Sequence, residues 1–262
     1  MSLEVVSKIQ ETPTQQPSIV LIHGACMGAW VWEGNFMDFF YERGFSVYAL
    51  SLSHHGNSKG SGRLRWNSIR RYVDDLDKVV QTIPGPVFLI GHSMGGFTIQ
   101  HYLQSPAKNV VGAALLCSAP SHGLWHLMGK LVLHYPFHFV QSVLQMSWLP
   151  VMKNKKRLQR VMFRKDFPSQ KMSEVMSSLQ DESFLAFLEM VFLRLPKIRQ
   201  LPVPVLIIGA EKDYLISVAD TKRMASRYGL SPHIVEGASH CLMLETGWEE
   251  VAEDIRKFAD PH

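Results

Sequence analysis

The sequence predicts an α/β fold, in which a mostly parallel central sheet is flanked by helices. Short runs of β-branched and other apolar residues alternate with longer amphipathic segments, which is the pattern that parallel strands and their crossover helices produce. This rhythm stops once, between about residues 120 and 200, where no strand pattern is found. A chain of 262 residues is long enough for one large core with an insertion.

The elements of the core follow in a regular order. The expected strands are 18–23, 45–51, 86–91, 109–117, 203–208 and 231–236, with 3–9 as a candidate edge strand. The expected helices are 29–43, 66–82, 95–105, 217–228 and 246–259, with Ser217 and Thr246 as N-caps and Gly44 and Gly229 as C-terminal stops.

Residues 120–200 are expected to form a helical lid inserted into a core made of residues 1–119 and 201–262. Leu, Phe, Met, Trp and Val recur there at helical spacing. Lys130 is the only formally charged residue from Asn109 to Met152, and a basic cluster follows at 153–157. We favour an inward-facing apolar stripe that packs on the core. The alternative is a surface that meets lipid, with the lysines reaching anionic headgroups.

Composition excludes several classes of protein. The 27 basic and 23 acidic side chains give a net charge of +4, too weak and too scattered to indicate a nucleic-acid interface. No apolar run reaches the roughly 18 to 20 residues of a membrane-spanning helix. Three cysteines (Cys26, Cys117, Cys241) without CxxC spacing argue against a disulfide framework, and no signal peptide is recognised at the start. We therefore expect a cytoplasmic protein.

The strongest chemical signal is the segment G-H-S-M-G-G at residues 91–96, which matches the pattern G-x-S-x-G between an apolar strand and a helix. A serine in that turn stands on a sharp bend, and the glycines leave room for neighbouring backbone. The following helix directs its N-terminal amides and positive dipole end at the serine. Ser93 is the candidate nucleophile.

A serine needs a base, and the base needs a carboxylate that orients it. Asp213 follows strand 203–208 and His240 follows strand 231–236, so both are expected at the edge of the sheet where catalytic groups of parallel sheets gather. Glu211 and Asp220 are rival acids; Glu211 lies nearer the strand end, and Asp220 is expected inside a helix.

The segment H-G-A-C-M-G-A-W at residues 23–30 follows the first strong strand. The backbone amides of Ala25 and Met94 are the expected donors of an oxyanion hole, each contributing about 3 kcal/mol. We interpret His23 as structural. Trp30, together with Trp125 and Trp148 of the insertion, is a candidate pocket residue, although Trp30 could equally pack on the following helix.

Other residues that could bind a metal are discounted. His54 and His55 are adjacent, and His134 and His138 have i, i+4 spacing, but Pro136 lies between the latter and no carboxylate partner is evident. We expect no metal and no cofactor. Cys26 and Cys241 lie near the proposed site and are interpreted as packing thiols.

With these residues in place, the chain resembles the α/β-hydrolase superfamily, of the lid-bearing esterase, lipase and lysophospholipase-like kind. The resemblance covers essentially the whole chain and rests on five segments: H-G-A at 23–25, H-H-G-N-S at 54–58, G-H-S-M-G-G at 91–96, G-A-E-K-D at 209–213 and S-H at 239–240. It implies a triad of Ser93, His240 and Asp213, oxyanion donors at Ala25 and Met94, and a lid at 120–200. At Ser51–Ser53 the chain lacks the acidic residue that many relatives carry, which we treat as structural.

Residue types narrow the chemistry within the family. Epoxide hydrolases and haloalkane dehalogenases use a carboxylate at the elbow, where this chain has Ser93. The segment 23–32 also resembles plant-type methyl esterases and hydroxynitrile lyases, but the lyases carry a lysine where this chain has Cys241, so an esterase is favoured.

The expected function is therefore hydrolysis of carboxylic esters, with a hydrophobic acyl group because the insertion is apolar and methionine-rich. The expected partners are small-molecule or lipid-like esters, with transient contact to a membrane surface left open and no nucleic acid. Three alternatives remain: a carbon–carbon bond hydrolase or a thioesterase with the same triad, or a non-catalytic receptor.

Overall fold

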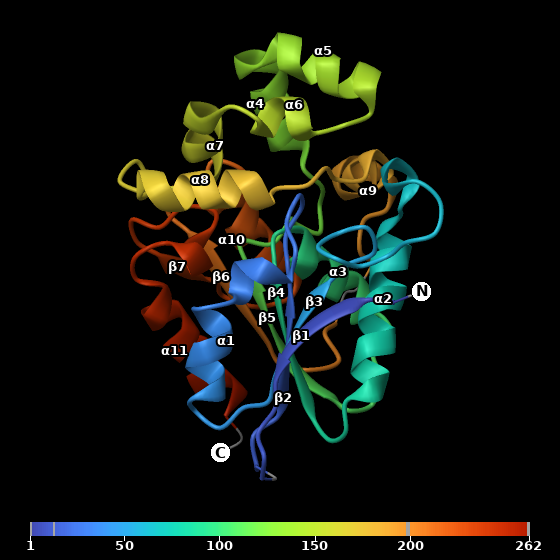
Figure 1. Ribbon diagram of the computed structural model, residues 1–262, viewed down its shortest axis with the longest axis vertical. Coiled ribbons are helices and arrows are strands. Elements are labelled where there is room, and N and C mark those ends of the chain that lie inside the picture. Colours follow the sequence, from blue (N-terminus) through green and yellow to red (C-terminus); the bar gives the residue numbers. More distant parts are fainter. Residues whose placement is uncertain (1, 13, 198–199, 261–262) are drawn as a thin grey trace.

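A computed structural model describes residues 2–12, 14–197 and 200–260. Its centre is a seven-stranded sheet with the order β1-β3-β2-β4-β5-β6-β7 (Figure 1). Only β1 runs antiparallel to its neighbour; the other pairs are parallel. The strands are β1 Glu4–Lys8, β2 Ser18–Ile22, β3 Val47–Ser51, β4 Val87–His92, β5 Val110–Leu116, β6 Val205–Ala210 and β7 His233–Val235.

Helices cover both faces of this sheet, and the strands are apolar for that reason. In β2, Ile19 and Leu21 pack into one hydrophobic cluster while Val20 and Ile22 pack into the other. The cluster of Val20 and Ile22 includes side chains of α2 (Ile69–Thr82), α3 (Met94–Tyr102) and α10 (Val218–Arg227). The opposite cluster includes side chains of α1 (Phe36–Tyr41) and α11 (Trp248–Ala259). The predicted fold class is confirmed.

Most departures from the expected elements occur at their ends. The expected helix 29–43 is two elements, a 3-10 turn η1 (Ala29–Trp32) and α1, separated at Gly34 with a φ of +73°. Ser217 caps α10 as expected, since its hydroxyl accepts a hydrogen bond from the Asp220 amide at 3.1 Å. The expectation for Thr246 was wrong: α11 begins at Trp248, and its N-cap is Gly247 with a φ of +91°.

Between β5 and β6 the chain is helical. The described part of residues 120–200 contains no strand, and we call this part the helical insertion. Most of its helices lie over the carboxyl ends of the strands, with α5 farthest from the sheet (Figure 1). They are α4 Trp125–His134, α5 Pro136–Gln145, α6 Leu149–Met152, α7 Lys155–Met162, α8 Ser169–Ser178, α9 Phe184–Leu188 and a π-helical turn η3 Glu189–Leu193.

None of the described helices is both long enough and apolar enough to cross a bilayer.

Candidate active site

Ser93 occupies the sharp turn between β4 and α3. Its φ of 50° and ψ of −111° are strained for a residue with a side chain, as expected for a nucleophile elbow. The backbone holds this turn: the Ser93 amide donates to the Leu116 carbonyl at 2.9 Å, and the Ser93 carbonyl accepts from the Ala119 amide at 3.1 Å. Although Ser93 is the N-cap of α3, its side chain makes no capping hydrogen bond. The hydroxyl is therefore not committed to the helix.

Two glycines make the turn sterically feasible. A Cβ on Gly95 would overlap the Ile22 carbonyl oxygen, and a Cβ on Gly91 would lie 2.6 Å from the Gly95 carbonyl carbon. Both approaches are closer than a side chain permits. Gly95 therefore lets the elbow pack against β2, and Gly91 lets the end of β4 approach the first turn of α3.

His240 and Asp213 form a buried pair at the carboxyl edge of the sheet. Nδ1 of His240 lies 2.8 Å from Oδ2 of Asp213, and the second oxygen of Asp213 accepts the amides of Leu215 at 2.8 Å and Ile216 at 2.9 Å. These two amides fix the carboxylate, so that Oδ2 faces the imidazole. The hydrogen bond assigns the proton to Nδ1 and leaves Nε2 as the basic nitrogen.

The rival acids have other partners. Glu211 accepts the Gly237 amide at 2.8 Å. Asp220 lies within α10, as expected. Its Oδ1 lies 3.2 Å from Nε2 of His122 and 2.8 Å from Nδ1 of His126. Among the three carboxylates, Asp213 is the one paired with His240.

His92 ties the elbow to the loop that carries His240. Its Nε2 lies 3.0 Å from the His240 carbonyl oxygen, and the two imidazole rings are 4.7 Å apart. Burial, and then the proximity of His240, hold the pKa of His92 well below its usual range. His92 is therefore a neutral donor, and since Ser93 is the next residue, this contact ties the turn of Ser93 to the loop of His240.

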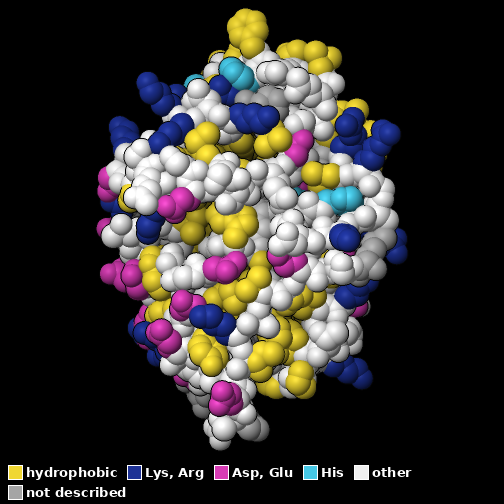
Figure 2. All heavy atoms as spheres, viewed as in Figure 1, with side chains coloured by type: hydrophobic (Ala, Val, Ile, Leu, Met, Phe, Trp, Pro, Cys, Tyr) yellow, Lys and Arg dark blue, Asp and Glu magenta, His cyan; other side chains and the backbone are white. Residues whose placement is uncertain are grey.

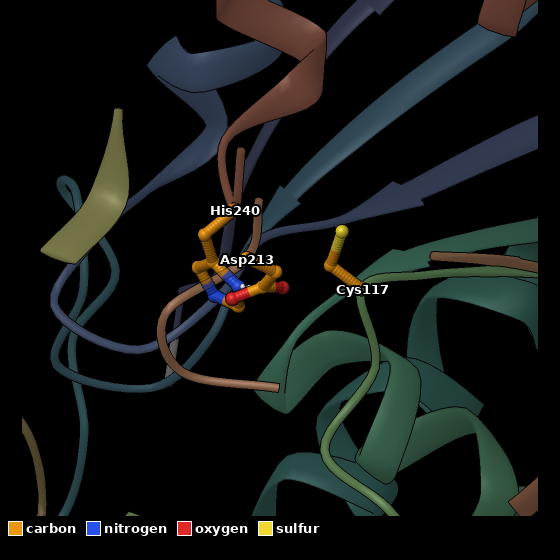
Figure 3. A group of neighbouring side chains, drawn as sticks. All are labelled: Cys117, Asp213 and His240. Carbon is orange, nitrogen blue, oxygen red and sulfur yellow. Dashed lines mark hydrogen bonds and ion pairs between the residues drawn. The ribbon is translucent and has the colours of Figure 1, made fainter. Parts of the chain in front are cut away.

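Cys117 is a neighbour of this pair that sequence reasoning missed. Figure 3 shows its thiol beside Asp213, with the side chains of Cys117, Asp213 and His240 converging from separate segments. One ligand-type atom from each lies within 4.8 Å of the others, a spacing that a metal ion could span. Burial, followed by the charge of Asp213, raises the pKa of the Cys117 thiol, whereas a metal ligand must be a thiolate. The Cys117 thiol is therefore protonated and lies beside the Asp213 carboxylate.

The loop after β2 packs closely against the elbow. A Cβ on Gly24 would lie 2.6 Å from Nδ1 of His92, so the loop needs glycine at this position. His23 has the structural role expected for it: its Nε2 accepts the Leu52 amide at 3.0 Å, and its Nδ1 donates to the Gly24 carbonyl at 2.7 Å. Burial, and then the charge of His55, lower the pKa of His23 to about 3. The ring stays neutral and holds the loop.

A small apolar cavity of about 70 Å³ adjoins Ser93 and is roofed by the insertion. Ala25, the first proposed oxyanion donor, lines it, while Met94, the second, is fully buried as the first residue of α3. The lining residues are Ala25, Cys26, Ser93, Ala119, Leu124, Leu127, Leu131, Trp148, Met152, Val161, Glu182, Phe187, Met190, Leu215 and Ile216.

Of the three candidate pocket tryptophans, Trp148 lines this cavity and stacks on Phe184. Trp30 packs against the hydrophobic cluster of α1 and α11 instead. Trp125 is 59% exposed and stacks on Phe192 at the surface. Neither Trp30 nor Trp125 is among the described residues of the lining.

The histidines discounted as metal ligands have other partners. His55 pairs with Glu182 at 3.0 Å, and Arg157 donates to His138 at 2.9 Å. His134 lies 3.0 Å from the Lys130 carbonyl. Glu182, from the insertion, is a second buried group that sequence reasoning missed, because no motif or periodic pattern marks it.

Three comparisons agree with this fold. A profile of the alpha/beta hydrolase family matches residues 19–254. Among curated proteins, the chain is 30% identical over 122 residues to polyneuridine aldehyde esterase of Rauvolfia serpentina, covering 44% of this chain and 45% of that protein. It is 39% identical over 83 residues to methyl jasmonate esterase 1 of Vitis vinifera, covering 30% of this chain and 31% of that protein.

The matched segments thus span less than half of the length of these curated relatives. Similarity in fold extends further. The crystal structure of a monoacylglycerol lipase from Paleococcus ferrophilus superposes with a TM-score of 0.72 at 17% identity, covering 99% of this chain and 98% of that one.

Proposed function

Because this chain belongs to the α/β-hydrolase family, we propose that it is a serine hydrolase that cleaves carboxylic esters. The observation that carries the proposal is the buried pair of His240 and Asp213, joined at 2.8 Å and tied through His92 to the strained turn that holds Ser93. The relatives named as esterases support the same reaction class.

In the proposed reaction, Oγ of Ser93 attacks the ester carbonyl carbon while Nε2 of His240 takes the hydroxyl proton. The carbonyl oxygen becomes negative and accepts hydrogen bonds from the amides of Ala25 and Met94. The alcohol leaves with the proton from His240, and an acyl-enzyme remains. Water then attacks this ester with His240 as base, which releases the acid and restores Ser93. These steps need no cofactor.

We propose a substrate with a hydrophobic acyl group, since the cavity beside Ser93 is lined almost entirely by apolar side chains. Its volume of about 70 Å³ is small beside the roughly 300–1,000 Å³ of ordinary ligand pockets. A lipid-like ester therefore requires the insertion to move. This supports residues 120–200 as a lid on a core of residues 1–119 and 201–262.

We further propose that the lid touches membranes transiently through its outer face. The most exposed apolar side chains of the described chain lie on α4 and α5: Leu133 is 78% exposed, Phe137 86% and Leu144 78%. Figure 2 shows hydrophobic side chains protruding at this end of the molecule, with Lys and Arg side chains on the flanks below them. Such a surface is unusual for a protein that meets only water.

The charge around this face favours anionic lipid. Residues 121–165 contain eight Lys or Arg and no Asp or Glu. Each basic side chain near an anionic membrane contributes about 1 kcal/mol to binding. Small-molecule or lipid-like esters are thus the proposed substrates, and an anionic lipid surface is the proposed partner of the lid.

The three cysteines are free and buried, which supports the reducing, cytoplasmic location expected for the protein.

Labelling with a fluorophosphonate tests the nucleophile directly. We expect covalent labelling of the wild-type protein at Ser93 and none in Ser93→Ala. A folded wild-type protein that does not react would contradict the triad and favour a non-catalytic receptor.

A further inference from the structure

Glu182 is a buried carboxylate that the helical insertion brings onto the core. It lies between α8 and α9 and is 1% exposed. Oε1 accepts the Tyr72 hydroxyl at 2.8 Å and the Ser183 amide at 2.6 Å. Oε2 accepts the Cys26 amide at 3.2 Å and faces Nε2 of His55 at 3.0 Å. Both oxygens are fully used, and three of the four partners belong to the core.

The Cys26 contact links Glu182 to the proposed oxyanion hole. Cys26 follows the proposed donor Ala25, and both line the cavity that contains Ser93 and Glu182. The φ of Cys26 is +66°, a left-handed conformation that costs energy for any residue with a Cβ. The Gln180 amide also donates to the Cys26 carbonyl at 3.0 Å. Segment 180–182 therefore holds Cys26 by its N–H and its C=O.

A carboxylate this close to a developing oxyanion would oppose the reaction unless its charge were balanced. His55 supplies the balance, because its second nitrogen faces the Ser53 carbonyl at 3.3 Å and both nitrogens can donate. Burial alone disfavours both charges, but the attraction between the two groups and their hydrogen bonds raise the pKa of His55 and lower the pKa of Glu182. The pair is charged and locally neutral.

Glu189 is a second buried carboxylate of the insertion, and it joins the insertion to the core outside the described lining of the cavity. Glu189 accepts the Ile69 amide of the core at 2.6 Å and pairs with Arg194 at 3.0 Å. It is 5% exposed, and the described lining of the cavity does not include it. Glu182 is also buried and also accepts the amide of a core residue. In its case the amide is that of Cys26, which follows the proposed oxyanion donor Ala25.

We propose that Glu182 is a positioning residue, which holds the Cys26 peptide in its left-handed conformation and thereby sets the Ala25 amide for the oxyanion. The inference rests on the proposed function for its catalytic consequence. It also links catalysis to the lid: when segment 180–182 lifts, the loop loses the bonds that hold Cys26. Lid position and oxyanion hole would then be coupled.

The decisive variant is Glu182→Gln, which keeps the size and shape of the side chain. Its NH2 group replaces one carboxylate oxygen and cannot accept the hydrogen bond from the Cys26 amide or from the Tyr72 hydroxyl. Losing one oxyanion donor costs about 100- to 1,000-fold in kcat. For a misplaced donor we expect a fall of about 10- to 100-fold, with KM within about twofold. A trifluoromethyl ketone, which mimics the tetrahedral state, should bind more weakly by the same factor, while the carboxylic acid product binds as before. The matched control Glu189→Gln should keep the wild-type kcat and lose only thermal stability.

Either of two kinetic results would overturn the proposal: a folded Glu182→Gln with wild-type kcat, or a lower kcat with unchanged affinity for the ketone. Amide hydrogen exchange over residues 24–28 separates this inference from the proposed function. Exchange should be faster in Glu182→Gln than in Glu189→Gln even if the wild type hydrolyses no ester, and equal rates would refute the positioning role. If Glu182→Gln does not fold, Tyr72→Phe removes one of the four bonds. It should show the same pattern with a smaller fall in kcat, and unchanged kcat and exchange would contradict the proposal.

Discussion

Nδ1 of His240 lies 2.8 Å from Oδ2 of Asp213, and each of these side chains is only 1% exposed. The two residues come from loops after different strands, β6 and β7. Such a buried pair holds one tautomer of the imidazole and stabilises the imidazolium that forms when it takes a proton. The proposed chemistry depends on this contact.

Replacing Asp213 with Asn should lower kcat by about 1,000- to 10,000-fold. The side-chain NH2 group would stand in place of Oδ2 and donate to Nδ1 of His240, so that the proton moves to Nε2 and this nitrogen can no longer act as the base. The fold should persist, since Oδ1 still accepts the amides of Leu215 and Ile216. Steady-state ester hydrolysis and circular dichroism measure the two effects. Glu211→Gln, in the same loop, is the matched control and should keep wild-type activity. More than a tenth of wild-type kcat in Asp213→Asn would rule out this pairing as the catalytic one.

His23 should make the fold sensitive to acid. Its pKa is lowered from 6.5 to about 3 by burial and by His55, so below pH 6.5 the unfolded chain binds a proton that the folded chain does not. Stability is therefore present above pH 6.5 and is lost as the pH falls toward 3, by about 1.4 kcal/mol per pH unit. Urea unfolding between pH 7 and pH 4.5 measures this slope.

His23→Gln is the comparison, since a glutamine oxygen can accept the Leu52 amide in place of Nε2 without titrating. The difference in unfolding free energy between wild type and variant should shift in favour of the variant as the pH falls. A difference that is independent of pH would mean that His23 does not carry the effect.

The fold and the pairing of His240 with Asp213 were predictable because their signals are local. Alternating apolar strands and helices define the sheet, and parallel strands bring their carboxyl ends to one edge. Ser93, Asp213 and His240 each directly or closely follow a strand, so their place at the carboxyl edge of the sheet could be inferred from order alone.

The other features of the site, namely the roles of Glu182, Cys117 and the tryptophans, depend on contacts that leave no periodic pattern in the sequence. Glu182 reaches Cys26 across 156 residues, from a short segment between two helices. Cys117 follows β5, and no sequence pattern indicates that it lies beside Asp213. For the tryptophans, sequence gives the apolar character but not the direction: Trp148 faces the cavity and Trp125 faces solvent.

Binding to lipid vesicles tests the outer face of the proposed lid. In a Ser93→Ala background, which prevents turnover, we expect binding to vesicles of phosphatidylcholine with phosphatidylglycerol and weaker binding to phosphatidylcholine alone. Phe137→Ser should weaken binding about 10- to 150-fold, because burial of one large apolar side chain contributes about 1.5–3 kcal/mol. Cosedimentation measures both effects.

The matched control for this surface is Ile9→Ser, since Ile9 is 55% exposed but lies just after β1, outside the insertion. Its binding should equal that of the parent protein. Equal binding of Phe137→Ser and Ile9→Ser, or no preference for anionic vesicles, would show that the lid is not the contact surface.

The most direct test of the proposed esterase is the hydrolysis of p-nitrophenyl esters from acetate to palmitate, with Ser93→Ala as the blank. We predict turnover that depends on Ser93 and is fastest for medium or long acyl chains, because the cavity beside Ser93 is apolar and roofed by the helical insertion. Hydrolysis at the wild-type rate by a folded Ser93→Ala protein, or no hydrolysis of any ester by the wild type, would contradict the account.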